Sequence, residues 1–253
     1  NAAARNLGAQ PDVFIANFRP GALAKLGFDS PTLSADNQKL IYCSEKGFLS
    51  GPYESRTALD EVAQMMGGLA YMTGPPGRPL RAGSSVIDIT GGMFGAIAIL
   101  SALHERAQTG RGREVSASLF ETTVFMVGQH MAQFGVSGTP APPMPERVSA
   151  WAVYDVFDVK NDEKVFVGVV SDGQWRAFCE AFGFTDWAQD DTLARNNDRV
   201  ARRAEIMPRL RAAFLEMNKN DLMDRLATTG LPFAPIARPE DMFDDPHLKA
   251  SGG

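Results

Sequence analysis

A single acid, Asp88, lies between a short β-type run, residues 84–87, and a long apolar helix that we expect to end at about residue 106. The first backbone N–H groups of a helix have no partner within the helix, and the helix dipole places partial positive charge there. This position therefore favours a carboxylate that is kept ionised.

Two glycines follow Asp88 by one helical turn, at Gly91 and Gly92. They remove side chains where another backbone or a bulky ligand could approach closely. A simpler interpretation of the acid is that Asp88 only caps the helix, because Asp is among the residues preferred at that position. The local sequence alone favours the cap.

The composition indicates an ordinary soluble protein with one large domain or two smaller ones: 253 residues, 44% of them hydrophobic and 22% charged. A net charge of −5 and a pI near 5.3 argue against a nucleic-acid surface, which requires a basic stripe. The longest apolar run, residues 93–103, is shorter than a membrane span, so we expect no membrane partner.

Metal and redox chemistry have no support in the sequence. Cys43 and Cys179 lack metal-ligand spacing, and reduced, buried thiols would suit the cytoplasm, where we expect the protein. The three histidines, His104, His130 and His247, form neither a metal cluster nor a Ser-His-Asp pattern. We therefore predict no metal site.

The first half of the chain has the pattern of an α/β protein. Short apolar runs at residues 12–16 and 39–44 predict strands, and helices are expected at residues 22–27 and 30–35 between them. Such a unit implies a right-handed parallel crossover. Residues 45–57 then follow the carboxyl end of the second strand, where α/β sheets place their ligands.

Further elements of this half are expected as a helix over residues 58–70, a strand over 115–120 and a helix over 121–134. A Gly/Pro-rich stretch, residues 135–147, then predicts a linker. We expect three parts: a large domain over residues 1–134, a linker over 135–150 and a small α+β domain over 151–253.

The small domain is predicted to open with a hairpin of residues 151–159 and 164–170. Asp172 is expected to cap the next helix, around residues 174–182. Later helices are expected at residues 199–217, kinked or split by Pro208, and at 221–229.

Five blocks occur in order between residues 16 and 115: ANFRPGALAKLGF, KGFLSGPYESR, LDEVAQMMGGLAYMTG, VIDITGG and TGRGREV. In their order and spacing they resemble the family III CoA transferases, also called the CaiB/BaiF family. The resemblance implies a Rossmann-like parallel-sheet large domain, present in part, a smaller α+β domain and an interlocked homodimer. It also implies that parts of the protein precede residue 1 and follow residue 253.

The resemblance also assigns roles. It implies that Asp88 is catalytic, that Asp60 supports it, and that N–H groups at Gly91 and Gly92 could hold an oxyanion. Residues along the CoA or near its acyl end would be Asn17, Phe18, Lys25, Lys46 and Arg56. Each has a plain alternative as a turn former, a core residue or a surface charge, and Asp60 would suit the first turn of a helix.

The implied activity moves CoA from an acyl-CoA thioester to a carboxylic acid through an aspartyl-CoA intermediate. CoA thioesters are then substrates, and no permanently bound cofactor is expected. Two alternatives remain: an acyl-CoA racemase of the same family, or a CoA-binding protein without turnover. In the racemase branch a His stands where this chain has Leu59, which cannot transfer a proton.

Overall fold

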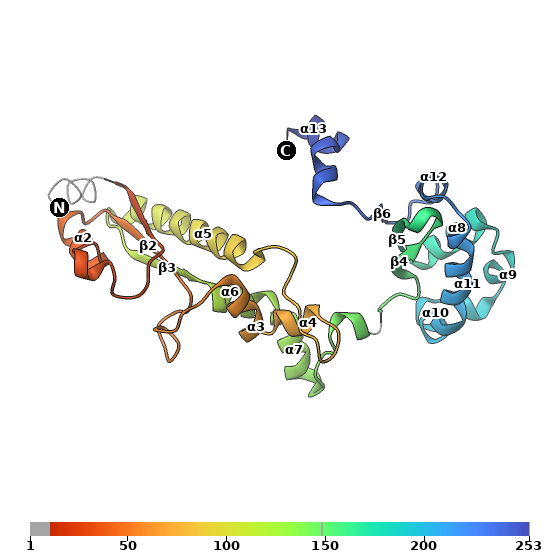
Figure 1. Ribbon diagram of the computed structural model, residues 1–253, viewed down its shortest axis with the longest axis horizontal. Coiled ribbons are helices and arrows are strands. Elements are labelled where there is room, and N and C mark those ends of the chain that lie inside the picture. Colours follow the sequence, from red (N-terminus) through yellow and green to blue (C-terminus); the bar gives the residue numbers. More distant parts are fainter. Residues whose placement is uncertain (1–10, 148, 253) are drawn as a thin grey trace. The chain divides into compact units, whose positions relative to one another are not determined.

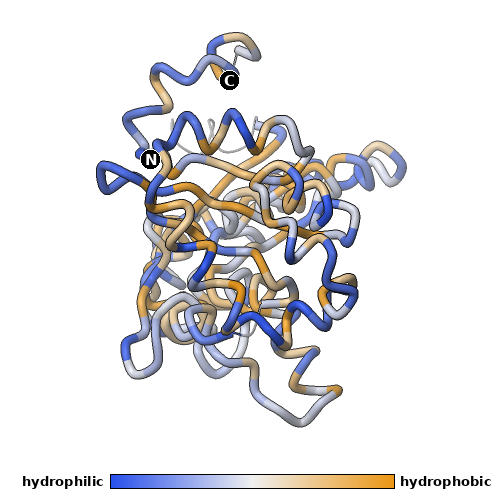
Figure 2. The backbone as a smooth tube through the Cα atoms, turned by 90° about the vertical axis from the view of Figure 1, so that its right-hand side faces the viewer, coloured by the Kyte–Doolittle hydropathy of each residue, from blue (hydrophilic) through white to orange (hydrophobic). Residues whose placement is uncertain are grey.

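The computed structural model describes residues 11–147 and 149–252. The chain divides into two compact units, Asn1–Arg147 and Val148–Gly253 (Figure 1). Hydrophobic and hydrophilic stretches alternate along the backbone (Figure 2). Asp88, implied to be catalytic, and the residues implied to lie along CoA all belong to the first unit.

The first unit is built on a three-stranded sheet in the order β1-β2-β3. Its strands are β1 (Val13–Ala16), β2 (Ile41–Lys46) and β3 (Glu114–Ser118). Both pairs are parallel, which confirms the predicted parallel crossover between the first two strands. The central strand β2 is buried from Ile41 to Ser44, as an apolar run in a covered parallel sheet should be.

The helices of this unit are η1 (Ala24–Leu26), α2 (Ser30–Asp36), α3 (Asp60–Met66), α4 (Leu69–Thr73), α5 (Val86–Thr109), α6 (Leu119–Met126), α7 (Gly128–Ser137) and η2 (Met144–Glu146). The helix predicted over residues 58–70 is divided between α3 and α4. Gly68 has a positive φ of 89°, and a side chain at Gly67 would overlap Thr123 of α6. The helix predicted over 121–134 is likewise two helices, and α7 continues into the predicted linker.

The strand predicted at residues 84–87 is wrong, because α5 already begins at Val86. Asp88 is therefore the third residue of the helix rather than its cap. α5 packs along β2 and β3 (Figure 1). The sheet and the start of α5 together position the acid.

One face of α5 carries exposed apolar side chains. Ile89, Met93, Ile97 and Leu100 follow helical spacing and are between 54% and 66% exposed. By length and composition α5 could cross a membrane, which corrects the expectation that no segment is long enough. Core helices of soluble proteins can be equally long and apolar, and α5 packs against a sheet.

The second unit has an antiparallel sheet in the order β4-β5-β6, with β4 (Tyr154–Asp158), β5 (Lys164–Gly168) and β6 (Phe233–Pro235). The pairing of β4 with β5 confirms the predicted hairpin. The helices are η3 (Lys160–Asp162), α8 (Asp172–Phe182), α9 (Thr185–Ala188), η4 (Asp191–Leu193), α10 (Asn196–Ala201), α11 (Arg203–Leu215), α12 (Lys219–Ala227), η5 (Pro239–Asp244) and α13 (Pro246–Ser251).

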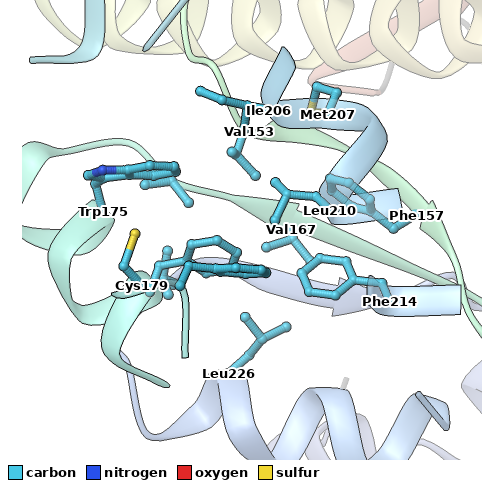
Figure 3. Close-up of a cluster of buried hydrophobic side chains, with 14 of the residues drawn as sticks. Val153, Phe157, Val167, Trp175, Cys179, Ile206, Met207, Leu210, Phe214 and Leu226 are labelled. Carbon is cyan, nitrogen blue, oxygen red and sulfur yellow. The ribbon is translucent and has the colours of Figure 1, made fainter. Parts of the chain in front are cut away.

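The core of this unit joins the sheet to α8, α11 and α12, as the side chains of Phe157, Cys179, Phe214 and Leu226 show (Figure 3). The predicted cap of α8 is wrong by one residue. The Ser171 side chain accepts the N–H of Gln174, while Asp172 pairs with the buried Arg199. Pro208 lies inside α11, and the break falls earlier, at Arg202.

The motif TGRGREV is explained by the turn between α5 and β3. Gly110 ends α5 in a left-handed conformation, with φ of 72°. Gly112 donates its N–H to the carbonyl of Gln38, and a side chain at Gly112 would overlap the carbonyl of Leu40. The second glycine therefore lets the chain enter the sheet beside β2.

We predict that Gly112→Ala lowers the free energy of unfolding by about 1–3 kcal/mol, because the added methyl meets rigid backbone. Gly128→Ala is the matched control, since a methyl there meets nothing within 4 Å. Urea titration followed by circular dichroism measures both. Equal midpoints for the two variants would contradict this account of the motif.

Candidate active site

Asp88 lines a cavity of about 850 Å³ at the carboxyl ends of β1 and β2. Residues at the starts of α3 and α5 also line it. Its polar and close-approach residues are Asn17, Glu45, Lys46, Asp60, Glu61, Arg81, Ser85, Asp88 and Gly92. The cavity thus lies where the sequence predicted a ligand, beyond the second strand of the sheet.

The start of α5 is capped by a residue of another helix. Oδ2 of Asp60 accepts the backbone N–H of Ile87 at 2.8 Å and that of Asp88 at 3.2 Å. Its Oδ1 accepts from the Gln64 side chain at 2.6 Å, and Asp60 is only 5% exposed. Asp60 therefore satisfies two of the N–H groups that a helix leaves unpaired. The capping role considered for Asp88 belongs to Asp60.

This arrangement also sets the charge state of Asp88. Burial raises the pKa of the Asp88 carboxyl, the nearby Asp60 raises it further, and Arg81 opposes both. The sequence predicted a carboxylate kept ionised by the helix N-terminus. In the structure the Asp60 carboxylate accepts the N–H groups at that end of the helix, and burial together with Asp60 shifts the pKa of Asp88 upward instead.

The segment before α5 is fastened to α3. Oε1 of Gln64 accepts the N–H of Ala82 at 2.8 Å, and Arg81 lies 3.8 Å from the carboxylate of Glu61. Arg81 thereby reaches the cavity beside Asp88. Sequence reasoning missed Arg81, although it opens the same segment as the acid.

Gly91 and Gly92 lie in the second turn of α5. Their N–H groups are used by the helix itself, which leaves no hydrogen to donate to an oxyanion and corrects that expectation. Close approach remains possible at Gly92, which lines the cavity and has open space beside it. A side chain at Gly91 would meet Leu119 at 3.3 Å.

The residues expected along CoA divide into two groups. Asn17 and Lys46 line the large cavity, and Lys46 also lines a neighbouring one of about 210 Å³, together with Phe18. Phe18 is 64% exposed, so it is not a core residue. Lys25 and Arg56 line neither cavity, and the Arg56 guanidinium lies 5.0 Å from the centre of the Tyr53 ring.

Sequence reasoning also missed Glu45, the second-last residue of β2, which lines both cavities. The signal was present, because Glu45 stands at the carboxyl end of a predicted parallel strand. Within residues 11–147 and 149–252, no group of three His, Cys, Asp or Glu side chains is arranged to hold a metal ion.

The family model for CoA-transferase family III matches residues 1–253. The chain belongs to CoA-transferase family III. Among curated relatives of the family, it is 34% identical over 250 residues to succinate–glutarate CoA-transferase of Agrobacterium fabrum, covering 98% of this chain and 62% of that protein. It is 31% identical over 228 residues to acetyl-CoA:oxalate CoA-transferase of Acetobacter aceti, covering 89% of this chain and 58% of that protein.

A solved structure of the family agrees with the fold. The crystal structure of a CaiB/BaiF family protein from Brucella suis superposes with a TM-score of 0.87 at 35% identity, covering 99% of this chain and 67% of that one. The chain spans less than two thirds of the length of both curated relatives: 62% of the Agrobacterium fabrum protein and 58% of the Acetobacter aceti protein.

We predict that Asp60→Asn moves the acidic limit of any reaction that requires ionised Asp88 to lower pH, because Asp88 loses a negative neighbour that raises its pKa. The variant should also unfold more easily, by about 1–2 kcal/mol, since a neutral amide is a weaker partner for the two N–H groups. A pH–rate profile and urea titration measure the two effects.

The sign of the stability effect follows from linkage. A raised pKa of Asp88 makes the folded state bind more protons than the unfolded one, so stability falls as pH rises through that window. In Asp60→Asn this decrease of stability with rising pH should be smaller. Asp36→Asn, at an exposed position of α2, is the control. An unmoved acidic limit in Asp60→Asn would contradict the coupling.

Proposed function

We propose that this chain carries the catalytic carboxylate of an enzyme that transfers CoA from an acyl-CoA thioester to a carboxylic acid. The observation that carries the proposal is the position of Asp88 in a cavity of about 850 Å³, with the helix cap supplied by Asp60. Because the cap does not use the Asp88 oxygens, they are available to a substrate. Membership of the family supports the same reaction.

In the proposed mechanism, an Asp88 oxygen attacks the donor thioester carbonyl, and the C–S bond breaks to release CoA thiolate. The product is a mixed anhydride of Asp88 and the donor acid. The thiolate then attacks the aspartyl carbonyl, which expels the donor carboxylate and leaves an aspartyl-CoA thioester. A carboxylate nucleophile suits these steps because each intermediate remains activated.

The second half of the cycle uses the acceptor acid and passes through the same kinds of intermediate in reverse order. The acceptor carboxylate attacks the aspartyl-CoA carbonyl, forms a second anhydride and releases the thiolate. The thiolate attacks the acceptor carbonyl of this anhydride, which yields acceptor-CoA and restores the Asp88 carboxylate. No proton or electron is consumed in the cycle.

The names of the relatives indicate the kind of acceptor. Lys46 and Arg81 line the cavity, but each is already paired with a glutamate. The relatives are named for succinate and glutarate and for oxalate, which are all dicarboxylic acids. We therefore extend the proposal to short dicarboxylic acids as acceptors. Asn17, Phe18 and Lys46 are the proposed contacts to CoA.

The racemase alternative is weakened by Leu59. This residue lies directly before Asp60, lines the cavity and is 64% exposed. Racemisation requires an acid and a base on opposite faces of the α-carbon, and an aliphatic side chain can supply neither. Transfer through Asp88 does not require that second group.

We predict that Asp88→Asn abolishes CoA transfer, by at least about a thousandfold, and leaves the fold intact. The amide keeps the shape of the side chain but is not a nucleophile, and the cap of α5 belongs to Asp60. Mass spectrometry of acceptor-CoA formed from a donor acyl-CoA by the complete protein measures the loss. Near wild-type transfer by Asp88→Asn would show that the nucleophile is another group.

We also propose a homodimer. The apolar stripe of α5, formed by Ile89, Met93, Ile97 and Leu100, is uncovered within the part of the chain that the structure describes. Exposed apolar surface of this kind marks an interface, and the family resemblance implies two interlocked copies.

The predicted result is a dimeric mass for the complete protein at micromolar concentration, measured by light scattering after gel filtration. Met93→Lys should weaken the assembly, because it places a charge within the stripe. Glu105→Lys, further along the same helix, is the control. A compact monomer for the wild type would contradict the proposal.

A further inference from the structure

Glu45 places a second carboxyl group beside α5, away from Asp88. The Cys43 thiol donates to Oε1 of Glu45 at 3.7 Å. A side chain at Gly95 of α5 would overlap the same oxygen, so the missing side chain of this glycine creates the space that the carboxyl group fills. Glu45 is thus held against the helix that carries Asp88, and it lines the same cavity.

The spacing of Asp88 and Gly95 along α5 is comparable to the reach of a short diacid. Asp88 and Gly95 are seven residues apart on α5, which corresponds to about 10 Å along the helix axis. Gly92 lies between them with open space beside it. A four- or five-carbon diacid joined to Asp88 as an anhydride extends roughly 6–7 Å beyond the Asp88 carboxyl carbon. Its far carboxylate therefore comes close to Glu45.

The charges around Glu45 make this approach unfavourable while Glu45 is ionised. The cations that line the two cavities are Arg19, Lys46 and Arg81. Arg81 pairs with Glu61, and Lys46 pairs with Glu54 at 3.5 Å. The acids that share the two cavities with Glu45 are Asp29, Glu54, Asp60, Glu61, Asp88 and Glu114. Two carboxylates in contact in such a site cannot both remain ionised.

We infer that Glu45 determines acceptor selectivity by taking up one proton from solvent when a dicarboxylate binds. Its O–H then donates a hydrogen bond to the far carboxylate of the acceptor. An acceptor with an uncharged far end binds without this proton. The inference rests on the proposed CoA transfer at Asp88.

Burial already raises the pKa of the Glu45 carboxyl, and the hydrogen bond from Cys43 opposes that rise. Proton uptake is therefore less unfavourable at this position than for an exposed glutamate. Above the pKa of Glu45, dicarboxylate binding should weaken as pH rises, because binding takes up a proton and the proton concentration falls. Binding of a monocarboxylate should not show this dependence.

The test compares glutarate with pentanoate, which have equal chain lengths, as acceptors for the complete protein between about pH 6 and pH 8.5. The ratio of KM for glutarate to KM for pentanoate should rise with pH in the wild type, by up to tenfold per pH unit. In Glu45→Gln the ratio should be independent of pH, since the amide donates a hydrogen bond but does not titrate. Glu105→Gln, at an exposed position of α5, should behave as the wild type.

A second measurement uses the wild type alone and does not depend on turnover or on a folded variant. Calorimetry in buffers of different ionisation enthalpy should show close to one proton taken up with glutarate and none with pentanoate. The same pH slope in wild type and Glu45→Gln, or equal proton uptake with both acids, would overturn the role of Glu45. Absence of transfer to every acid would instead remove the proposed function, and the proton count would still test Glu45.

Discussion

The two hydrogen bonds from the N–H groups of Ile87 and Asp88 to one oxygen of Asp60 connect the parts of the candidate site. They join α3 to the first turn of α5, although the residues are 27 and 28 positions apart in sequence. Without this contact the start of α5 would need a local cap, and Asp88 itself would be a suitable one. The cap from α3 leaves the Asp88 carboxylate for chemistry.

The same contact has an electrostatic consequence. Burial of Asp88 raises the pKa of its carboxyl, and the Asp60 carboxylate at the start of α5 raises it further. A carboxylate of raised pKa is a stronger nucleophile, provided that the pH is high enough to ionise it. Arg81, held by Glu61 at the other side, limits the rise. The acid is thereby tuned by residues from three segments of the chain.

Local patterns predicted those features that local forces decide. The apolar runs before the turns at Asn17 and Lys46 correctly indicated parallel strands, because a buried strand needs no distant residue to explain its composition. The run Ser-Ser-Val-Ile before Asp88 was misleading. Its β-branched residues favour a strand, but the Asp60 cap from α3 starts the helix at Val86. A long-range hydrogen bond outweighed local propensity.

The limits of the sequence are also visible in the binding residues. Asn17, Lys46 and Asp88 line one cavity, whereas Lys25 and Arg56 lie outside its lining. A basic residue in a loop does not reveal the direction of its side chain. Glu45 was passed over because its contact with the helix depends on Gly95, about fifty residues later in the chain. Only the packed structure brings the two together.

The central claim is that Asp88 becomes covalently acylated during turnover. Hydroxylamine, which traps activated acyl groups, should be added while the complete protein converts a donor acyl-CoA, and the peptide that contains Asp88 should then be sequenced by mass spectrometry. We expect a hydroxamate on Asp88 that requires the donor and does not form on Asp60, which is buried and hydrogen-bonded. Sustained turnover with an unmodified Asp88, or a hydroxamate on a different side chain, would contradict the account.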